Sequence, residues 1–146
     1  MGGGYLNYSI GYGSFVGGGV INHASGWNST VGGGENNQAT GPGSFVGGGG
    51  WDGITTAGNT ASGGASTVGG GIGNIAAEVY STVGGGYYNN ASAGSYYSTV
   101  GGGVLNTAGG QSATVLAARK VRCSPCSRCC AWLRSSHPLR CAPCPG

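Results

Sequence analysis

Residues 16–30 read V-G-G-G-V-I-N-H-A-S-G-W-N-S-T, and a close copy of this stretch follows at once. If Val is counted as position 1, later copies begin at Val31, Val46, Val68, Val83 and Val100. A first copy begins at Met1 and the pattern reaches Val115, so the spacings are 15, 15, 15, 22, 15, 17 and 15 residues. A fixed period of this length is typical of solenoids, in which each repeat forms one coil that stacks on the next.

The repeat length predicts a thin two-sheet roll. Fifteen residues at about 3.3 Å each give roughly 50 Å of chain, enough for two short strands and two turns. Positions 14 and 1 are two residues apart, as are positions 7, 9 and 11, so each set points to one face of its strand. These positions hold Ser, Val, Asn, Ala and Gly in most copies. We therefore expect a narrow interior of small side chains over residues 1–115, in an all-β fold of about seven coils.

Position 7 is Asn in every copy, and this column permits two structural interpretations. Stacked amides can form a hydrogen-bonded ladder along the roll, and Asn also tolerates the left-handed turn conformation. The column consists of Asn7, Asn22, Asn37, Asn59, Asn74, Asn89 and Asn106.

Large side chains gather at positions 5, 12 and 13 and in the insertions, and we expect them to face outward. The fourth copy has about seven extra residues around Trp51, and the sixth has two near Gly94. Insertions in solenoids form loops on one edge. The candidate contact surface from the sequence comprises Trp27, Trp51, Tyr80, Tyr87, Tyr96 and Tyr97.

Charge divides the chain into two parts. All six Lys and Arg residues lie at or after Arg119, whereas the three acids, Glu35, Asp52 and Glu78, lie in the repeats. The repeats therefore have a net charge of −3 and the tail +6, which sum to the +3 of the whole chain. Without basic side chains, the repeats lack the groups that neutralise phosphates, so nucleic acid is not an expected partner. No run of about 20 apolar residues could span a membrane.

The repeats contain no arrangement that indicates catalysis. The acids and His23 occupy different positions of different copies, so no paired carboxylates or His–carboxylate pair follows from the pattern. The Gly triplets lack the Lys and Ser or Thr of a phosphate-binding loop. We expect no enzymatic activity and no cofactor.

Residues 116–146 form an irregular tail that contains all six Cys residues. Leu116-Ala117-Ala118 stand where three Gly are expected, and Ala-Ala is what Gly codons rich in G and C yield when they are read one base out of frame. We expect a frameshifted or disordered tail, in a chain that is part of a longer one. Two C-x2-C pairs leave open a four-thiolate zinc site formed by Cys123, Cys126, Cys141 and Cys144, or a set of disulfides.

The repeats resemble the head repeats of trimeric autotransporter adhesins and related Gly-rich bacterial surface or fibre proteins. The stretch S29-T30-V31-G32-G33 with N36, A39 and G41 is similar to the family pattern S-x-A-I-G-x-x-A-x-A-x-G, although Gly stands where the family has Ile. The resemblance covers residues 1–115. It implies a left-handed parallel β-roll, association of three chains, and an extracellular or cell-surface location.

Two functional hypotheses follow. The first is a structural and adhesive segment that binds host, matrix or neighbouring copies through its outer Tyr, Trp, Asn, Ser and Gly, a mixture that antibody paratopes also use. The alternative is a flat face that binds ice or a polysaccharide through a column of Thr at position 15, which Phe15 and Phe45 interrupt. This column contains Thr30, Thr67, Thr82, Thr99 and Thr114.

Overall fold

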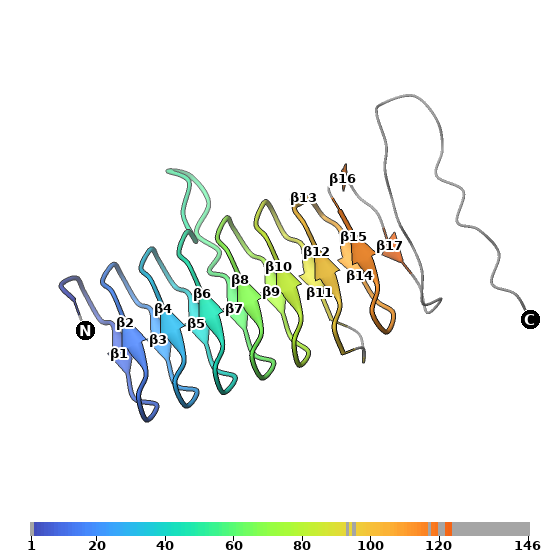
Figure 1. The fold of residues 1–146 in the computed structure, drawn as a ribbon. Helices are drawn as coiled ribbons and strands as arrows, with labels where there is room; N and C mark the ends of the chain where they lie inside the picture. The colour runs from blue at the N-terminus through green and yellow to red at the C-terminus, as the bar shows by residue number, and fades with distance from the viewer. Residues whose placement is uncertain (1, 93, 95, 117, 120–121, 124–146) are drawn as a thin grey trace, which may run out of the picture.

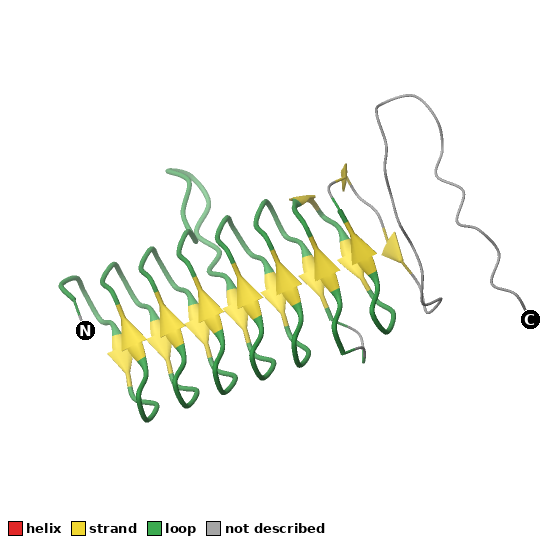
Figure 2. Ribbon diagram, viewed as in Figure 1, coloured by secondary structure: helices red, strands yellow, loops and turns green. Residues whose placement is uncertain are grey.

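The chain folds as a row of stacked coils that forms a β-solenoid (Figure 1). The structure, a computed structural model, describes residues 2–92, 94, 96–116, 118–119 and 122–123. Every element within these ranges is a two-residue strand, and the strands are joined by turns (Figure 2). No helix occurs among the described residues, so none of them could cross a membrane in helical form. The all-β solenoid of about seven coils is thus confirmed.

Two parallel sheets form the sides of the roll. Each coil contributes one strand to each sheet, and each strand pairs with its equivalent in the next coil. The first sheet contains positions 8 and 9, in strands β1 (Tyr8–Ser9), β3 (His23–Ala24), β5 (Gln38–Ala39), β7 (Thr60–Ala61), β9 (Ile75–Ala76), β11 (Asn90–Ala91), β14 (Thr107–Ala108) and β17 (Arg122–Cys123). The second contains positions 15 and 1, in strands β2 (Phe15–Val16), β4 (Thr30–Val31), β6 (Phe45–Val46), β8 (Thr67–Val68), β10 (Thr82–Val83), β12 (Thr99–Val100) and β15 (Thr114–Val115).

The interior is as narrow as the sequence predicts. The Val column of the second sheet and the Ala column of the first are fully buried from coil 2 onward and form one continuous core. The Asn column and most of the Ser column are buried beside them. Because strand pairing keeps equivalent residues in register, as in Val31 with Val46, each column stacks like on like.

Gly at position 2 is required by the close approach of successive coils. A Cβ atom on Gly32 would overlap the carbonyl oxygen of Gly47 in the next coil, and the equivalent overlap recurs along the column. Because the obstacle is backbone, it cannot move aside as the end of a flexible side chain could. The Gly triplets therefore serve the stacking of the roll.

The long insertion of the fourth coil forms a hairpin that projects from the roll, as expected (Figure 1). Trp51 and Thr56 form an antiparallel bridge, and the Ala57 N–H closes the loop by donating to the Gly50 carbonyl at 2.8 Å. Ile54 at its tip is 94% exposed. The shorter insertion lies partly outside the described residues. Its Gly94 N–H donates to Glu78 Oε1 at 3.1 Å.

Strand pairing continues beyond residue 115, where the sequence boundary between roll and tail was placed. Strand β16 (Ala118–Arg119) pairs with β13 (Gly103–Val104), and β17 pairs with β14 so that Cys123 lies opposite Ala108. These partners are 15 residues apart, as in the repeats. The coil period thus persists to residue 123, although the residue types of the repeat stop at Val115.

Candidate contact surfaces

The Asn column forms a hydrogen-bonded ladder through the roll. Asn59 Nδ2 donates to Asn37 Oδ1 at 3.1 Å, and the Asn59 backbone N–H donates to the same oxygen at 2.9 Å. Equivalent bonds join the other pairs, and the amide nitrogens also donate to Gly carbonyls of the turns, as Asn74 Nδ2 does to Gly70 and Gly86. From Asn22 onward the ladder is buried, and its amides are used in bonds within the roll.

The second interpretation of the Asn column, a left-handed backbone, is wrong for position 7. Positive φ angles occur instead at the neighbouring position 6 and at position 13. Gly and Asn adopt this region readily, whereas other residues lose roughly 1–2 kcal/mol there. Large side chains nevertheless occupy it at Leu6, Ile21, Tyr80, Tyr88, Tyr97 and Leu105, with φ between 50° and 65°.

Positions 12 and 13 form an aromatic edge at one turn of the roll. The Tyr80 and Tyr97 rings stack with centroids 5.2 Å apart and planes within 5° of parallel. Tyr96 lies beside Tyr97 at 6.5 Å, and Tyr12 contacts Trp27 at 6.2 Å. All five side chains are more than half exposed. Four residues of the sequence-derived surface thus lie on this edge in two groups, Trp27 beside Tyr12 and, three coils further along, Tyr80, Tyr96 and Tyr97.

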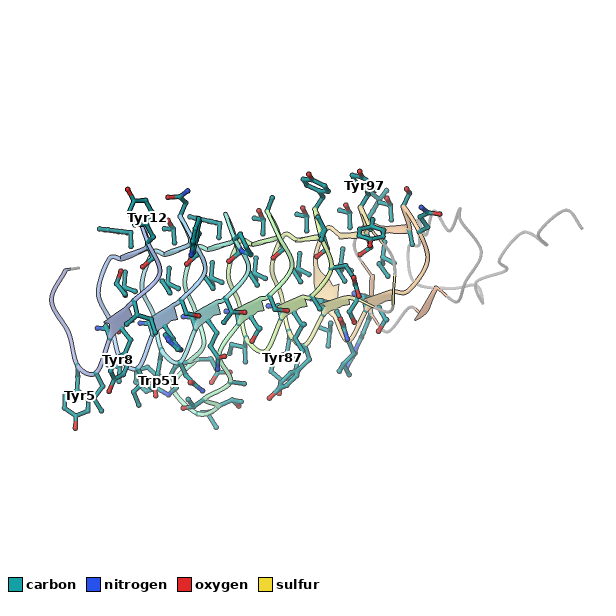
Figure 3. The ribbon with its side chains drawn as sticks, turned by 90° about the horizontal axis from the view of Figure 1, so that it is seen from below. Tyr5, Tyr8, Tyr12, Trp51, Tyr87 and Tyr97 are labelled. Atoms are coloured by element: carbon teal, nitrogen blue, oxygen red, sulfur yellow. The ribbon has the colours of Figure 1, made fainter. Side chains whose placement is uncertain are left out.

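The other two residues of that surface belong to a different side of the roll. Trp51 and Tyr87 project on the same side as Tyr5 and Tyr8, whereas Tyr12 and Tyr97 project on the opposite side (Figure 3). The sequence analysis therefore joined two separate surfaces into one, and the outward prediction holds for both.

Two shallow grooves on the first sheet were missed by the sequence analysis. The N-terminal groove, of about 410 Å³, is lined by Tyr8, Ile10, Ile21, His23, Asn36 and Gln38. The C-terminal groove, of about 440 Å³, is lined by Gly73, Ile75, Tyr88, Asn89, Asn90, Leu105 and Thr107. Alternation within the strand predicts that position 8 points outward when position 9 is buried, whereas the sequence gives no signal for the positive φ of position 6.

The Thr column lies on the outer face of the second sheet. Thr67, Thr82, Thr99 and Thr114 are direct partners in successive strands, which forms an unbroken row over four coils. Phe15, Thr30 and Phe45 continue the column toward the N-terminus, as the sequence predicts. The four Thr side chains of this row are half-buried.

Among the titratable side chains of the repeats, His23 packs against the Tyr8 ring, with the ring centroids 6.0 Å apart. No group of three His, Cys, Asp or Glu residues that could hold a metal forms among the described residues. In the hairpin, the N–H groups of Thr55 and Ile54 donate to Asp52 Oδ1 at 2.7 and 2.9 Å, and they hold the pKa of this exposed carboxyl below its usual value. The proposed zinc ligands Cys126, Cys141 and Cys144 lie outside the described residues, as does the Cys123 side chain.

The geometry defines a class of protein, the repeat β-solenoid with a thin uncharged core. No family model matches the chain, and no curated protein matches its sequence.

Proposed function

We propose that the solenoid is a structural and adhesive repeat segment without catalytic activity, which binds neighbouring copies or a host or matrix surface. One observation supports this proposal above the others: the aromatic edge formed by Tyr12, Trp27, Tyr80, Tyr96 and Tyr97 is exposed although the rings are large and apolar. Aromatic side chains with a polar atom are enriched where proteins meet partners.

The resemblance to adhesin head repeats supports the same function. It also supports a trimer and an extracellular or cell-surface location. We propose that the aromatic edge is the surface through which copies associate, because it is rigid. Stacked Tyr and Trp side chains lose little conformational entropy when a partner covers them.

Sedimentation of the full chain tests this function. We expect concentration-dependent association for the wild type, and a monomer for a variant combining Tyr12→Ser, Trp27→Ser, Tyr80→Asn and Tyr97→Asn. Asn suits the positive φ of the last two positions, so the variant should fold. Pro42→Ser, an exposed change at position 12 of the third coil, is the matched control. The proposal fails if the wild type stays monomeric and adsorbs to immobilised matrix protein no better than the variant does.

The row of four paired Thr favours a second candidate, a flat face that binds ice or a polysaccharide. Its methyl and hydroxyl groups repeat with the spacing of the coils, about 4.8 Å for paired strands. In this case the combined variant Thr82→Val and Thr99→Val should lose inhibition of ice recrystallisation. If the wild type does not inhibit ice recrystallisation, the ice-binding hypothesis is wrong.

A further inference from the structure

The two grooves are built in the same way on either side of the hairpin. The N-terminal groove uses positions 6, 8 and 10 of coils 1–3, and the C-terminal groove uses positions 6, 7 and 8 of coils 5–7. The fourth coil, between them, contains the hairpin of residues 51–57. Two independent stretches of the chain thus present an equivalent hollow on one face of the first sheet.

One wall of each groove consists of large side chains at position 6, where the positive φ favours Gly or Asn. Ile21, Tyr88 and Leu105 stand at position 6 with φ of 56°, 50° and 57°. Asn36 and Gly73 occupy the same position in other coils, which shows that residues suited to this conformation fit there. Each of these large side chains is 41–48% exposed, so nearly half of its surface still faces solvent. Backbone strain of this kind is typical of functional positions.

The lining combines apolar and aromatic side chains with amide and hydroxyl groups, and it includes the imidazole of His23. The rings of Tyr8 and Tyr88 provide apolar faces, and Gln38, Asn36 and Thr107 provide amide and hydroxyl groups. Neither groove contains Lys, Arg, Asp or Glu, and no Lys or Arg occurs before Arg119. An acidic ligand would find no Lys or Arg in either groove, whereas a neutral molecule rich in hydroxyl groups matches the amide, hydroxyl and ring groups of this lining.

We propose that the two grooves bind a neutral polysaccharide, with the sugar rings against the tyrosines and the hydroxyl groups bonded to the amides. Three coils span about 10 Å along the roll, the length of two or three sugar rings. A protein interface needs about 800 Å² and 20–30 residues on each side. Each groove offers six or seven residues, and the hairpin stands between the two grooves. The proposal goes beyond the adhesive function and uses a different side of the roll from the aromatic edge.

Affinity electrophoresis of the full chain tests the proposal, with gels that contain xyloglucan, mannan or dextran as neutral probes and heparin as a charged comparator. One variant, Tyr88→Asn with Leu105→Asn, changes the C-terminal groove. A second, Tyr8→Ser with Ile21→Asn, changes the N-terminal groove. Asn relieves the positive φ at three of the four sites, so neither variant should melt below the wild type. Trp27→Ser and Thr82→Val are matched controls on the aromatic edge and the Thr row.

We expect at least one neutral polysaccharide to retard the wild type and both control variants, and each groove variant to bind it roughly tenfold more weakly, a loss of about one well-made contact. Four results overturn the proposal: no retardation by any neutral probe, retardation by heparin alone, equal retardation of the groove variants, or loss of retardation in Thr82→Val. If the groove variants instead abolish self-association, the grooves hold a second copy. Loss of self-association in Trp27→Ser with retardation unchanged separates this site from the adhesive edge.

Discussion

The inside and the outside of the roll follow opposite rules. From coil to coil the interior repeats Val, Ala, Ser and Asn, whereas position 8 on the outside changes from Tyr8 through His23 and Gln38 to Ile75. In-register stacking explains the contrast, because each interior residue contacts its own equivalent above and below. A set of side chains that packs well in one coil therefore packs equally well in every coil. Most outer residues meet solvent and vary from coil to coil, although position 15 repeats Thr in five coils.

Position 6 shows where this contrast has an exception. It faces outward, but its positive φ favours Gly or Asn, and several coils have Ile, Leu or Tyr there. An outer position that accepts many residue types gives little information about function. Position 6 is different, because Ile21, Tyr88 and Leu105 occupy a backbone conformation that favours Gly or Asn, and this choice of residue calls for an explanation other than backbone conformation.

The largest effect is expected from breaking the ladder inside. Asn74→Ala should lower the free energy of unfolding by about 3–5 kcal/mol, because it leaves the Asn89 N–H and the Gly70 and Gly86 carbonyls without their buried partners. Gln38→Ala, an exposed change at position 8, is the control on the outer face and should change stability by less than about 0.5 kcal/mol. Urea denaturation followed by circular dichroism measures both. If both variants lose the same free energy of unfolding, the hydrogen bonds of the ladder do not stabilise the fold.

Removing core volume should have the next largest effect. Val83→Ala deletes two methyl groups from a fully buried column and should destabilise the roll by about 2 kcal/mol. The adjacent change Thr82→Ala is on the outer face and serves as its control. A loss below about 0.5 kcal/mol for Val83→Ala in the same denaturation assay would mean that the two sheets close over the gap.

A smaller, stabilising effect is expected where the interior has unpaired polar atoms. The Ser29, Ser44, Ser66 and Ser98 hydroxyls are buried without a partner, and the last coil has Ala113 at the same position. Ser44→Ala should therefore raise the free energy of unfolding by about 1 kcal/mol. Ser81→Ala is the matched control, because its hydroxyl donates to the Glu78 carbonyl at 2.6 Å and its loss should destabilise. Destabilisation by both changes would reveal a partner for Ser44.

Exchanging residues at position 6 tests how strongly the backbone conformation restricts an outer position. Ile21→Asn should raise stability by about 1 kcal/mol, and Asn36→Ile should lower it by a similar amount, since both positions have φ near 56°. Thermal unfolding of the two variants measures this. If Ile21→Asn lowers the melting temperature, the exposed Ile21 side chain stabilises the fold by contact, and the strain is not evidence for function.

The smallest effect is a local one in the hairpin. Because hydrogen bonds hold the pKa of Asp52 below its usual value, the carboxylate stabilises the turn above its unfolded pKa, and this contribution is lost as the pH falls through the folded pKa. In acid, the Thr55 amide proton should exchange faster and its NMR shift should move, while the amides of the ladder stay unchanged. Asp52→Asn should remove the pH dependence. An unaltered titration of the Thr55 amide in that variant would assign it to another group.

Most of the architecture could be predicted because repetition reveals it. The two-sheet roll, the buried Val column and the projecting Trp51 loop all follow from the spacing of residue types, and the Asn ladder was one of two interpretations of its column. The left-handed positions were not predicted, because Ile21 and Leu105 give no turn signal. The grooves were missed for the same reason, since they depend on where position 6 turns the chain. The continuation to Cys123 was missed because residue types change after Val115, whereas the backbone pairing of a parallel coil depends little on side chains.

The central claim is that hydrogen bonds run through the interior from coil to coil, while most outer residues vary. Hydrogen exchange of the backbone amides is the most direct test of this claim. The amides of Asn37, Asn59 and Asn74, which donate to side-chain oxygens of the preceding coil, should exchange only through global unfolding and therefore at similar, slow rates. Ile54 and Thr55 in the hairpin should exchange orders of magnitude faster. Exchange of the three Asn amides as fast as that of the hairpin would contradict the ladder and, with it, this account of the fold.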